Sequence, residues 1–151
     1  MTYVDLKLQK LADGTYDLII GEGDFVFTEG LDTTVITSIL SDARASDTDV
    51  GQARYRGGWL PNVEFQRANS QLGSLLWLME QRRRTTESLN LAVDLTEKAL
   101  VWLVEDGIAR SVQVFGSFQG EGAILDITIT SFSGETDSVF VPLWRKTING
   151  A

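Results

Sequence analysis

One long helical pattern sets the main constraint on how this chain of 151 residues can fold. The pattern begins at Thr85, whose hydroxyl can cap a helix N-terminus, and Glu87 follows in the first turn. It continues to Asp106 and ends before Gly107, a residue type common just past the end of a helix. About 20 residues rising 1.5 Å each predict a helix roughly 30 Å long, which needs a large surface to pack against.

The predicted helix has two apolar faces instead of the one stripe that packing on a single sheet requires. Two faces predict either a helix wrapped on several sides or a second surface kept for a partner. One face holds Leu89, Ala92, Val93, Leu100, Leu103 and Val104, and the other holds Leu91, Leu95, Ala99 and Trp102.

After the helix, apolar and polar residues alternate in three segments, which is the pattern of half-buried strands. The segments are centred on residues 112–114, 125–129 and 139–143, with a glycine-containing break between each pair. We expect a three-stranded meander in which Pro142 marks an edge strand, because proline cannot donate a hydrogen bond to its neighbour.

The first part of the chain carries shorter strand patterns. Residues 5–11 and 16–20 alternate on either side of a turn that contains Asp13 and Gly14, which predicts a hairpin. The glycine-rich segment 21–24 breaks this pattern and reads as a turn. It lacks the third glycine of a dinucleotide fingerprint and the Gly-Lys-Ser/Thr of a P-loop.

From Asp32 the apolar period changes to that of a helix, which Asp32 or Thr33 can cap and which should end near Ala43. Residues 44–69 show no clean period, and a loop of that length inside a compact domain is usually functional or mobile. A short helix should begin at Ser70.

Together these patterns predict an α+β fold, with helices packed on an antiparallel sheet, an N-terminal hairpin and a C-terminal three-stranded meander. We expect residues 1–151 to form a single domain. A chain of this length can bury enough surface to fold alone, and no repeat or domain boundary is visible.

Composition excludes several kinds of chemistry. The chain has no Cys and no His, so Ser-His-Asp triads, Cys-His dyads and thiolate or histidine metal sites are excluded. Its 21 acidic residues could still serve a carboxylate enzyme or bind Mg²⁺, but none lies in a recognisable motif. We therefore expect no enzymatic activity, no cofactor and no bound metal.

Net charge narrows the range of partners. The formal charge is −8, whereas nucleic-acid binding needs a basic face, so we expect no nucleic-acid partner. No apolar run reaches 18 residues, so we expect no membrane partner, and the N-terminus shows no signal-peptide pattern. These features predict a protein made in a cytoplasm.

Two segments are candidate partner-binding sites. Arg82, Arg83 and Arg84 could dock an acidic protein surface, or they could pair with carboxylates and cover a helix end. The segment around Arg56 and Trp59 combines arginine, aromatic residues and glycines, the composition of interface hot spots. The alternative is that Trp59 fills the core.

Short motifs follow one another along the middle of the chain. They are Gly-Gly-Trp at 57–59, Leu-Gly-Ser-Leu-Leu-Trp-Leu at 72–78, three arginines before Thr-Thr-Glu at 85–87, and Ala-Leu-Val-Trp-Leu-Val-Glu-Asp-Gly-Ile-Ala at 99–109, followed by a Val-x-Val strand. In that order they resemble the Mu-like phage baseplate family over roughly residues 31–132. Leu60 stands where members of that family carry a second tryptophan.

The resemblance implies a non-enzymatic part of a contractile phage or prophage tail. The family is similar to the small wedge component of T-even baseplates, which implies six copies around the tube where the sheath begins. The implied partners are other baseplate wedge proteins, the tail sheath protein and the tail tube or hub. The implied locations are the host cytoplasm during assembly and the virion tail. Related wedge proteins carry Glu-Pro-Arg at the end of their long helix. The comparable place here reads Glu105-Asp106-Gly107, so Glu105 matches the glutamate but the proline and arginine are absent.

An edge strand suits such a role, because it can extend a partner's sheet through main-chain hydrogen bonds. We expect residues 138–144, which include Val139 and Val141, or the N-terminal strand to seed the first sheath ring in this way. The runner-up function is a small acidic binding protein of the immunity type that masks a basic partner. A carboxylate enzyme is the third.

Overall fold

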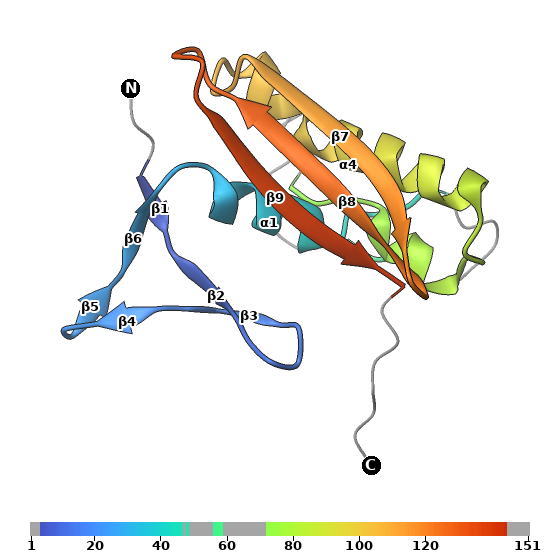
Figure 1. Cartoon of the computed structure of the whole chain (residues 1–151), viewed down its shortest axis with the longest axis horizontal. Helices are drawn as coiled ribbons and strands as arrows, with labels where there is room; N and C mark the ends of the chain where they lie inside the picture. The colour runs from blue at the N-terminus through green and yellow to red at the C-terminus, as the bar shows by residue number, and fades with distance from the viewer. Residues whose placement is uncertain (1–3, 47, 49–55, 59–71, 145–151) are drawn as a thin grey trace.

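The computed structural model describes residues 4–46, 48, 56–58 and 72–144 (Figure 1). Its main body is a three-stranded antiparallel sheet with helices on one face, which confirms the predicted α+β fold and the C-terminal meander. Neighbouring strands pair in sequence order. They are β7 (Ser111–Gln119), β8 (Gly122–Thr130) and β9 (Thr136–Leu143).

The long helix is α4 (Thr86–Glu105), with the ends that the sequence predicts. The Thr85 hydroxyl accepts a hydrogen bond from the Ser88 amide at 3.1 Å, and Gly107 adopts a positive φ of 70° just beyond the helix. Apart from Val104, which is exposed, the residues of both predicted apolar faces are buried or partly buried, because α4 contacts β7, α1 (Asp32–Leu40) and η1 (Leu76–Gln81). The interpretation of a helix wrapped on several sides is therefore confirmed.

Helix α1 differs from its prediction at both ends. Neither Asp32 nor Thr33 caps it: the N-cap is Leu31, which makes no side-chain cap, and the Thr33 hydroxyl donates instead to the Leu6 carbonyl. The helix ends at Leu40 and not near Ala43, because Ser41 is extended. The chain from Ser41 onward then forms backbone hydrogen bonds with Ser74.

The same pairing explains why the next helix begins later than expected. Ser70 lies outside the described residues, and residues 72–75 are not helical, since Ser74 exchanges backbone hydrogen bonds with Ser41 and Ala43 at 2.8 and 2.9 Å. The helix that follows is η1, a 3₁₀ helix that begins only at Leu76.

The N-terminal residues form three two-stranded antiparallel ladders that make a three-cornered unit beside the sheet (Figure 1). The hairpin around Asp13 and Gly14 is confirmed, and the segment 21–24 is a turn, as predicted, within a second hairpin. The ladders pair β1 (Val4–Leu6) with β6 (Phe27–Glu29), β2 (Leu8–Lys10) with β3 (Tyr16–Leu18), and β4 (Ile20–Gly21) with β5 (Asp24–Phe25).

A closed ring of backbone hydrogen bonds joins the three ladders. The Lys7 amide donates to Val26 at 2.8 Å, the Val26 amide to Ile19 at 2.9 Å, and the Ile19 amide to Lys7 at 3.2 Å. None of residues 4–29 is buried, so this unit has no side-chain core of its own. Main-chain bonds hold it together, and the 2.6 Å bond from the Thr34 hydroxyl to Asp5 helps to attach it to α1.

The hydrophobic core lies between the inner face of the sheet and the helices. Gly116 of β7 lets α4 approach closely, because a Cβ atom there would lie 2.9 Å from the Leu89 side chain. The core residues with no exposed surface are Val35, Ala92, Leu100, Leu103, Ala109, Leu125 and Ile127.

Candidate partner-binding surfaces

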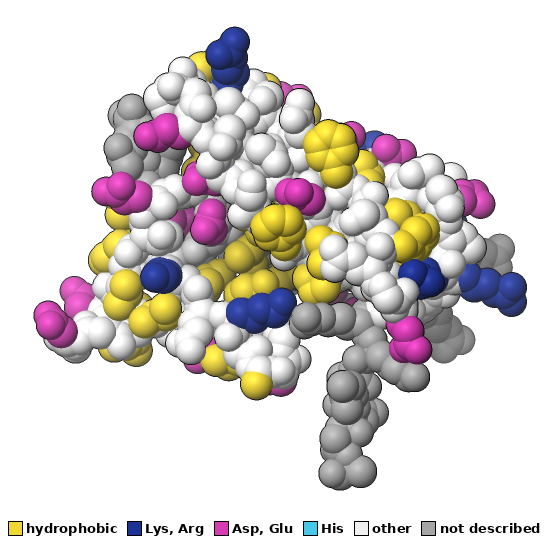
Figure 2. All heavy atoms as spheres, in the orientation of Figure 1, with side chains coloured by type: hydrophobic (Ala, Val, Ile, Leu, Met, Phe, Trp, Pro, Cys, Tyr) yellow, Lys and Arg dark blue, Asp and Glu magenta, His cyan; other side chains and the backbone are white. Residues whose placement is uncertain are grey.

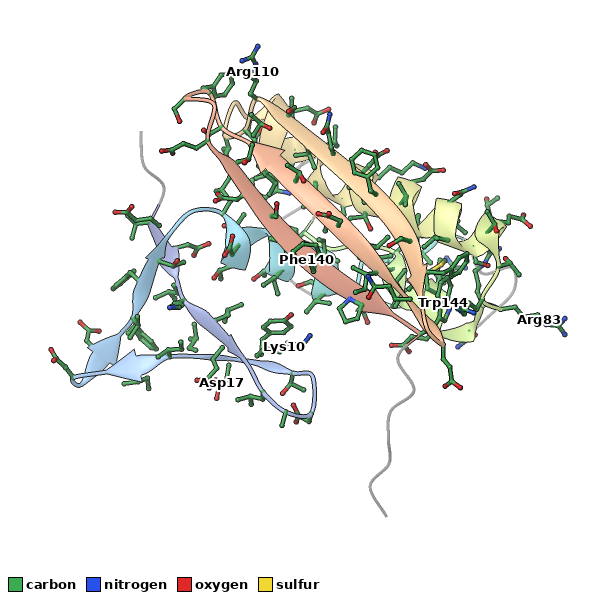
Figure 3. All side chains as sticks on the ribbon, in the orientation of Figure 1. Lys10, Asp17, Arg83, Arg110, Phe140 and Trp144 are labelled. Atoms are coloured by element: carbon green, nitrogen blue, oxygen red, sulfur yellow. The ribbon has the colours of Figure 1, made fainter. Side chains whose placement is uncertain are left out.

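The three arginines lie between η1 and α4 and differ in what they contact. Arg84 donates through Nη2 to the Gly120 carbonyl at 2.7 Å and through Nε to the Gly122 carbonyl at 3.3 Å. It therefore ties the start of α4 to the turn between β7 and β8. The side chains of Arg82 and Arg83 are exposed and have no hydrogen-bond or ion-pair partner in the described part of the chain, and Arg83 points outward (Figure 3).

Arg84 is the first of a series of side-chain contacts that includes two aromatic residues. Its guanidinium carbon lies 4.6 Å from the centre of the Phe118 ring, within the range of a cation–π contact. The Phe118 ring stacks on that of Trp144, with 6.5 Å between centroids, and the Trp144 indole donates to the Met79 carbonyl at 3.0 Å. The sequence analysis did not predict this series of contacts. Phe118 has the same strand parity as the buried Val114, and that signal could have found it.

The glycine-rich loop is described only at residues 56–58, and Trp59 lies outside the described residues, as does most of 44–69. Gly57, with φ of 63°, packs against the Trp77 indole: a Cβ atom at Gly57 would lie 2.9 Å from that ring. The Trp77 indole in turn donates to the Ala43 carbonyl at 2.9 Å. Arg56 enters this arrangement through its backbone, since its carbonyl accepts from the Ala45 amide at 2.7 Å.

The Gly-Ser pair at 73–74 fixes where α1 ends. A Cβ atom at Gly73 would lie 2.8 Å from the Ala43 backbone nitrogen, so a side chain there would collide with main-chain atoms. The buried Ser74 hydroxyl donates to the Ile39 carbonyl, one of the groups that the end of a helix leaves unpaired. The 72–78 motif is therefore explained by packing within the chain.

The end of α4 explains the 99–109 motif in the same way. The amides of Ile108 and Ala109 both donate to the Leu103 carbonyl at 2.9 Å, and Leu103 and Ala109 have no exposed surface. Glu105, by contrast, is exposed at the last position of the helix. Acidic groups are disfavoured at a helix C-terminus, so the dipole of α4 gives no reason for a glutamate at this position.

Strand β9 can offer a partner its backbone but not the side chains of Val139 and Val141. Val139 and Val141 point into the core and are only 7% exposed, so their side chains cannot reach a partner. Within the described residues, β9 pairs with β8 on one side and with no strand on the other. The hydrogen-bonding edge, and not the valine side chains, is the available feature.

Three further observations concern charge, metals and membrane spans. Burial, and then the nearby Asp137 carboxylate, raises the pKa of Asp32 in the first turn of α1. Among the residues that the structure describes, no three Asp or Glu side chains are grouped so that they could hold a metal ion. Nor is any helix in this part both long and apolar enough to cross a membrane.

Comparison with known proteins places the chain in a family. The model of the family described as phage protein GP46 matches residues 31–136, close to the span of the resemblance noted above. The Mu-like prophage FluMu protein gp46 of Haemophilus influenzae is 30% identical over 126 residues, which covers 83% of this chain and 86% of that protein. The baseplate protein gp46 of Escherichia phage Mu is 31% identical over 94 residues, 60% of this chain and 62% of that protein. On these matches, the chain belongs to the phage protein GP46 family.

Proposed function

We propose that this chain is a non-enzymatic structural part of a contractile tail baseplate, where six copies join wedge proteins and initiate the sheath. Membership of the GP46 family and similarity to a phage Mu protein named as a baseplate protein support the baseplate role. The proposed sites of action are the host cytoplasm during assembly and then the virion tail. The observation that supports sheath initiation is the edge of β9 that no other described strand pairs with.

Pro142 indicates which amides of β9 face that edge. A proline in a strand lies where its missing N–H would not have joined the ladder. Successive N–H groups alternate between the two sides of a strand, so those of Ser138 and Phe140 share the direction of Pro142, away from β8. These groups are free to extend the sheet with a strand from the sheath protein, the mode of recognition known as β-augmentation.

Arg82, Arg83 and Arg84, here called the arginine corner, supply a second contact in this proposal. Arg82 and Arg83 are exposed beside the structural Arg84, so they can dock the acidic surface of a wedge protein or of the tube or hub without loosening the fold. Exposed charge pairs contribute mainly to orientation and to the rate of encounter. Arg56, Trp59 and Glu105 remain proposed contact residues.

The first test is deletion of this gene from a phage or prophage that forms contractile tails. We expect negative-stain microscopy of the lysate to show missing tails, or tubes without sheath, and the gene supplied in trans to restore them. Normal contractile tails in the deletion would overturn the baseplate role. The acidic binding-protein function, with one basic partner, would then take its place.

Ser138→Pro tests sheath initiation separately. It removes an amide that faces the free edge while leaving the β8–β9 ladder, and Ser138→Ala is the matched control. We expect Ser138→Pro to give baseplates and tubes that lack sheath, and Ser138→Ala to give complete tails. If Ser138→Pro also gives complete tails, strand addition at β9 is refuted while the baseplate role stands.

A further inference from the structure

The outer face of the sheet, opposite the helices, differs in composition from the rest of this acidic chain. Its residues are those that alternate with the buried positions of β7, β8 and β9, and they are mainly Ser, Thr, Gln and apolar types. Asp126 is the one charged side chain that strand parity places on this face. Depletion of charge together with exposed aromatic residues is typical of the core of a protein interface.

The strand register brings two aromatic residues to either side of Asp126. Phe115 of β7 and Phe140 of β9 are its direct cross-strand partners, so the three form one row across the sheet. The two rings are 64% and 58% exposed. Figure 2 shows this face toward the viewer, with separated yellow side chains on a mostly white surface, and Figure 3 labels Phe140 within it.

One oxygen of the Asp126 carboxylate lacks a hydrogen-bond donor among the described residues. Asp126 Oδ1 has essentially no exposed surface and finds no hydrogen-bond donor in the described structure. A buried carboxylate oxygen without a donor is unfavourable, and native proteins nearly always satisfy such groups. Because this oxygen is covered in the free chain, an incoming donor reaches it only when the carboxylate or a flanking side chain turns. The donor would then satisfy the oxygen while its surroundings covered the two exposed rings.

The chemistry of the row selects the donor. An arginine guanidinium is planar, donates to carboxylates through several N–H groups, and packs its flat face on aromatic rings. A second copy of this chain pairing through the same face would bring two Asp126 carboxylates together, and like charges across an interface repel. An anionic lipid or nucleic-acid surface is disfavoured by the same charge.

We propose that the Phe115–Asp126–Phe140 row docks a neighbouring tail protein that inserts an arginine between the two rings. This inference rests on the proposed baseplate role and adds a contact distinct from the β9 edge and the arginine corner. The partner is defined by its chemistry: a protein surface on which an arginine is surrounded by apolar residues.

The test uses the gene deletion complemented with variants of the full chain. We expect Asp126→Arg to abolish complete tails, and Phe115→Ala or Phe140→Ala to lower their yield at least about tenfold, as interface hot spots do. The matched control is Phe132→Ala. Phe132 is 65% exposed and lies in the turn between β8 and β9, off the row, so its variant should assemble normally. Circular dichroism and thermal unfolding of the purified variants establish that each one folds.

Second-site revertants of Asp126→Arg identify the partner residue. We expect them to replace an arginine in another tail protein with Asp or Glu. Revertants confined to this chain would overturn the proposal, as would normal assembly by folded Asp126→Arg and Phe140→Ala. Normal tails in the gene deletion would instead remove the baseplate role, so the two failures are distinguishable.

Discussion

Replacing Gly73 by alanine should destabilise the protein more than any strain in its backbone angle can account for. Gly73 has a φ of 120°, and holding an alanine at a sparsely populated positive φ costs about 1–3 kcal/mol. The added Cβ would also lie 2.8 Å from the Ala43 nitrogen and 2.9 Å from the Ser41 oxygen. Both contacts are main-chain atoms held by the pairing with Ser74, and forcing such packing apart costs about 1–3 kcal/mol more. The free energy of unfolding should therefore fall by about 2–6 kcal/mol, out of a typical total of 5–15 kcal/mol.

Gly30→Ala is the matched control, because Gly30 has nearly the same φ, 122°. The nearest atom to its added Cβ would be a carboxylate oxygen of the Asp137 side chain at 3.2 Å, which can move by a few tenths of an ångström. Urea unfolding followed by circular dichroism should show a loss of about 1–3 kcal/mol for Gly30→Ala and a larger loss for Gly73→Ala. Equal losses for the two variants would refute the reasoning, because the close approach at Gly73 would then contribute nothing.

Three further predictions concern the core, a cap and pH. Leu103→Ala should lower the free energy of unfolding, measured in urea, by about 2–5 kcal/mol. Val104→Ala should lower it far less, because the neighbouring Val104 side chain is already 40% exposed. Thr85→Ala should cost about 1 kcal/mol by removing the cap of α4, and Thr85→Ser should retain most of the stability, as thermal melts can check. Because the pKa of Asp32 is raised on folding, the stability linked to its protonation is fully present in acid and is lost as pH rises through that pKa. Asp32→Asn should therefore melt above the wild type at pH 7, with the difference vanishing at about pH 3, and an unchanged difference at both pH values would refute the linkage.

Sequence periodicity predicted the elements in which side chains alone decide the structure. The α4 ends are set by the Thr85 hydroxyl and the positive φ of Gly107, both of which are local signals. The meander is set by strict alternation, with Leu125 and Ile127 buried in the middle strand. Local chemistry was sufficient wherever the contact partners lie close in sequence or repeat with a regular period.

Elements fixed by distant backbone contacts could not be predicted in this way. The end of α1 and the late start of η1 depend on hydrogen bonds between Ser41, Ala43 and Ser74, residues more than thirty positions apart. For the same reason the cap at Asp32 or Thr33 was predicted wrongly, since the Thr33 hydroxyl bonds to the Leu6 carbonyl.

The candidate surfaces were predictable as residue types but not as arrangements. The run of three arginines was visible in the sequence, yet only the fold distinguishes Arg84, whose side chain bonds to Gly120, from Arg82 and Arg83, whose side chains make no such bond in the described structure. The row centred on Asp126 depends on register between three strands, which alternation within each strand does not determine.

Because a ring of hydrogen bonds joins Lys7, Ile19 and Val26, we expect the N-terminal unit to open as a single unit in amide hydrogen exchange. None of these residues can leave the ring without breaking two of its three bonds, so their amides should exchange at one common rate. Since residues 4–29 bury no side chain, that rate should be much faster than the rate of the α4 and β8 amides. The N-terminal unit should therefore open and close as a whole many times during each global unfolding of the body.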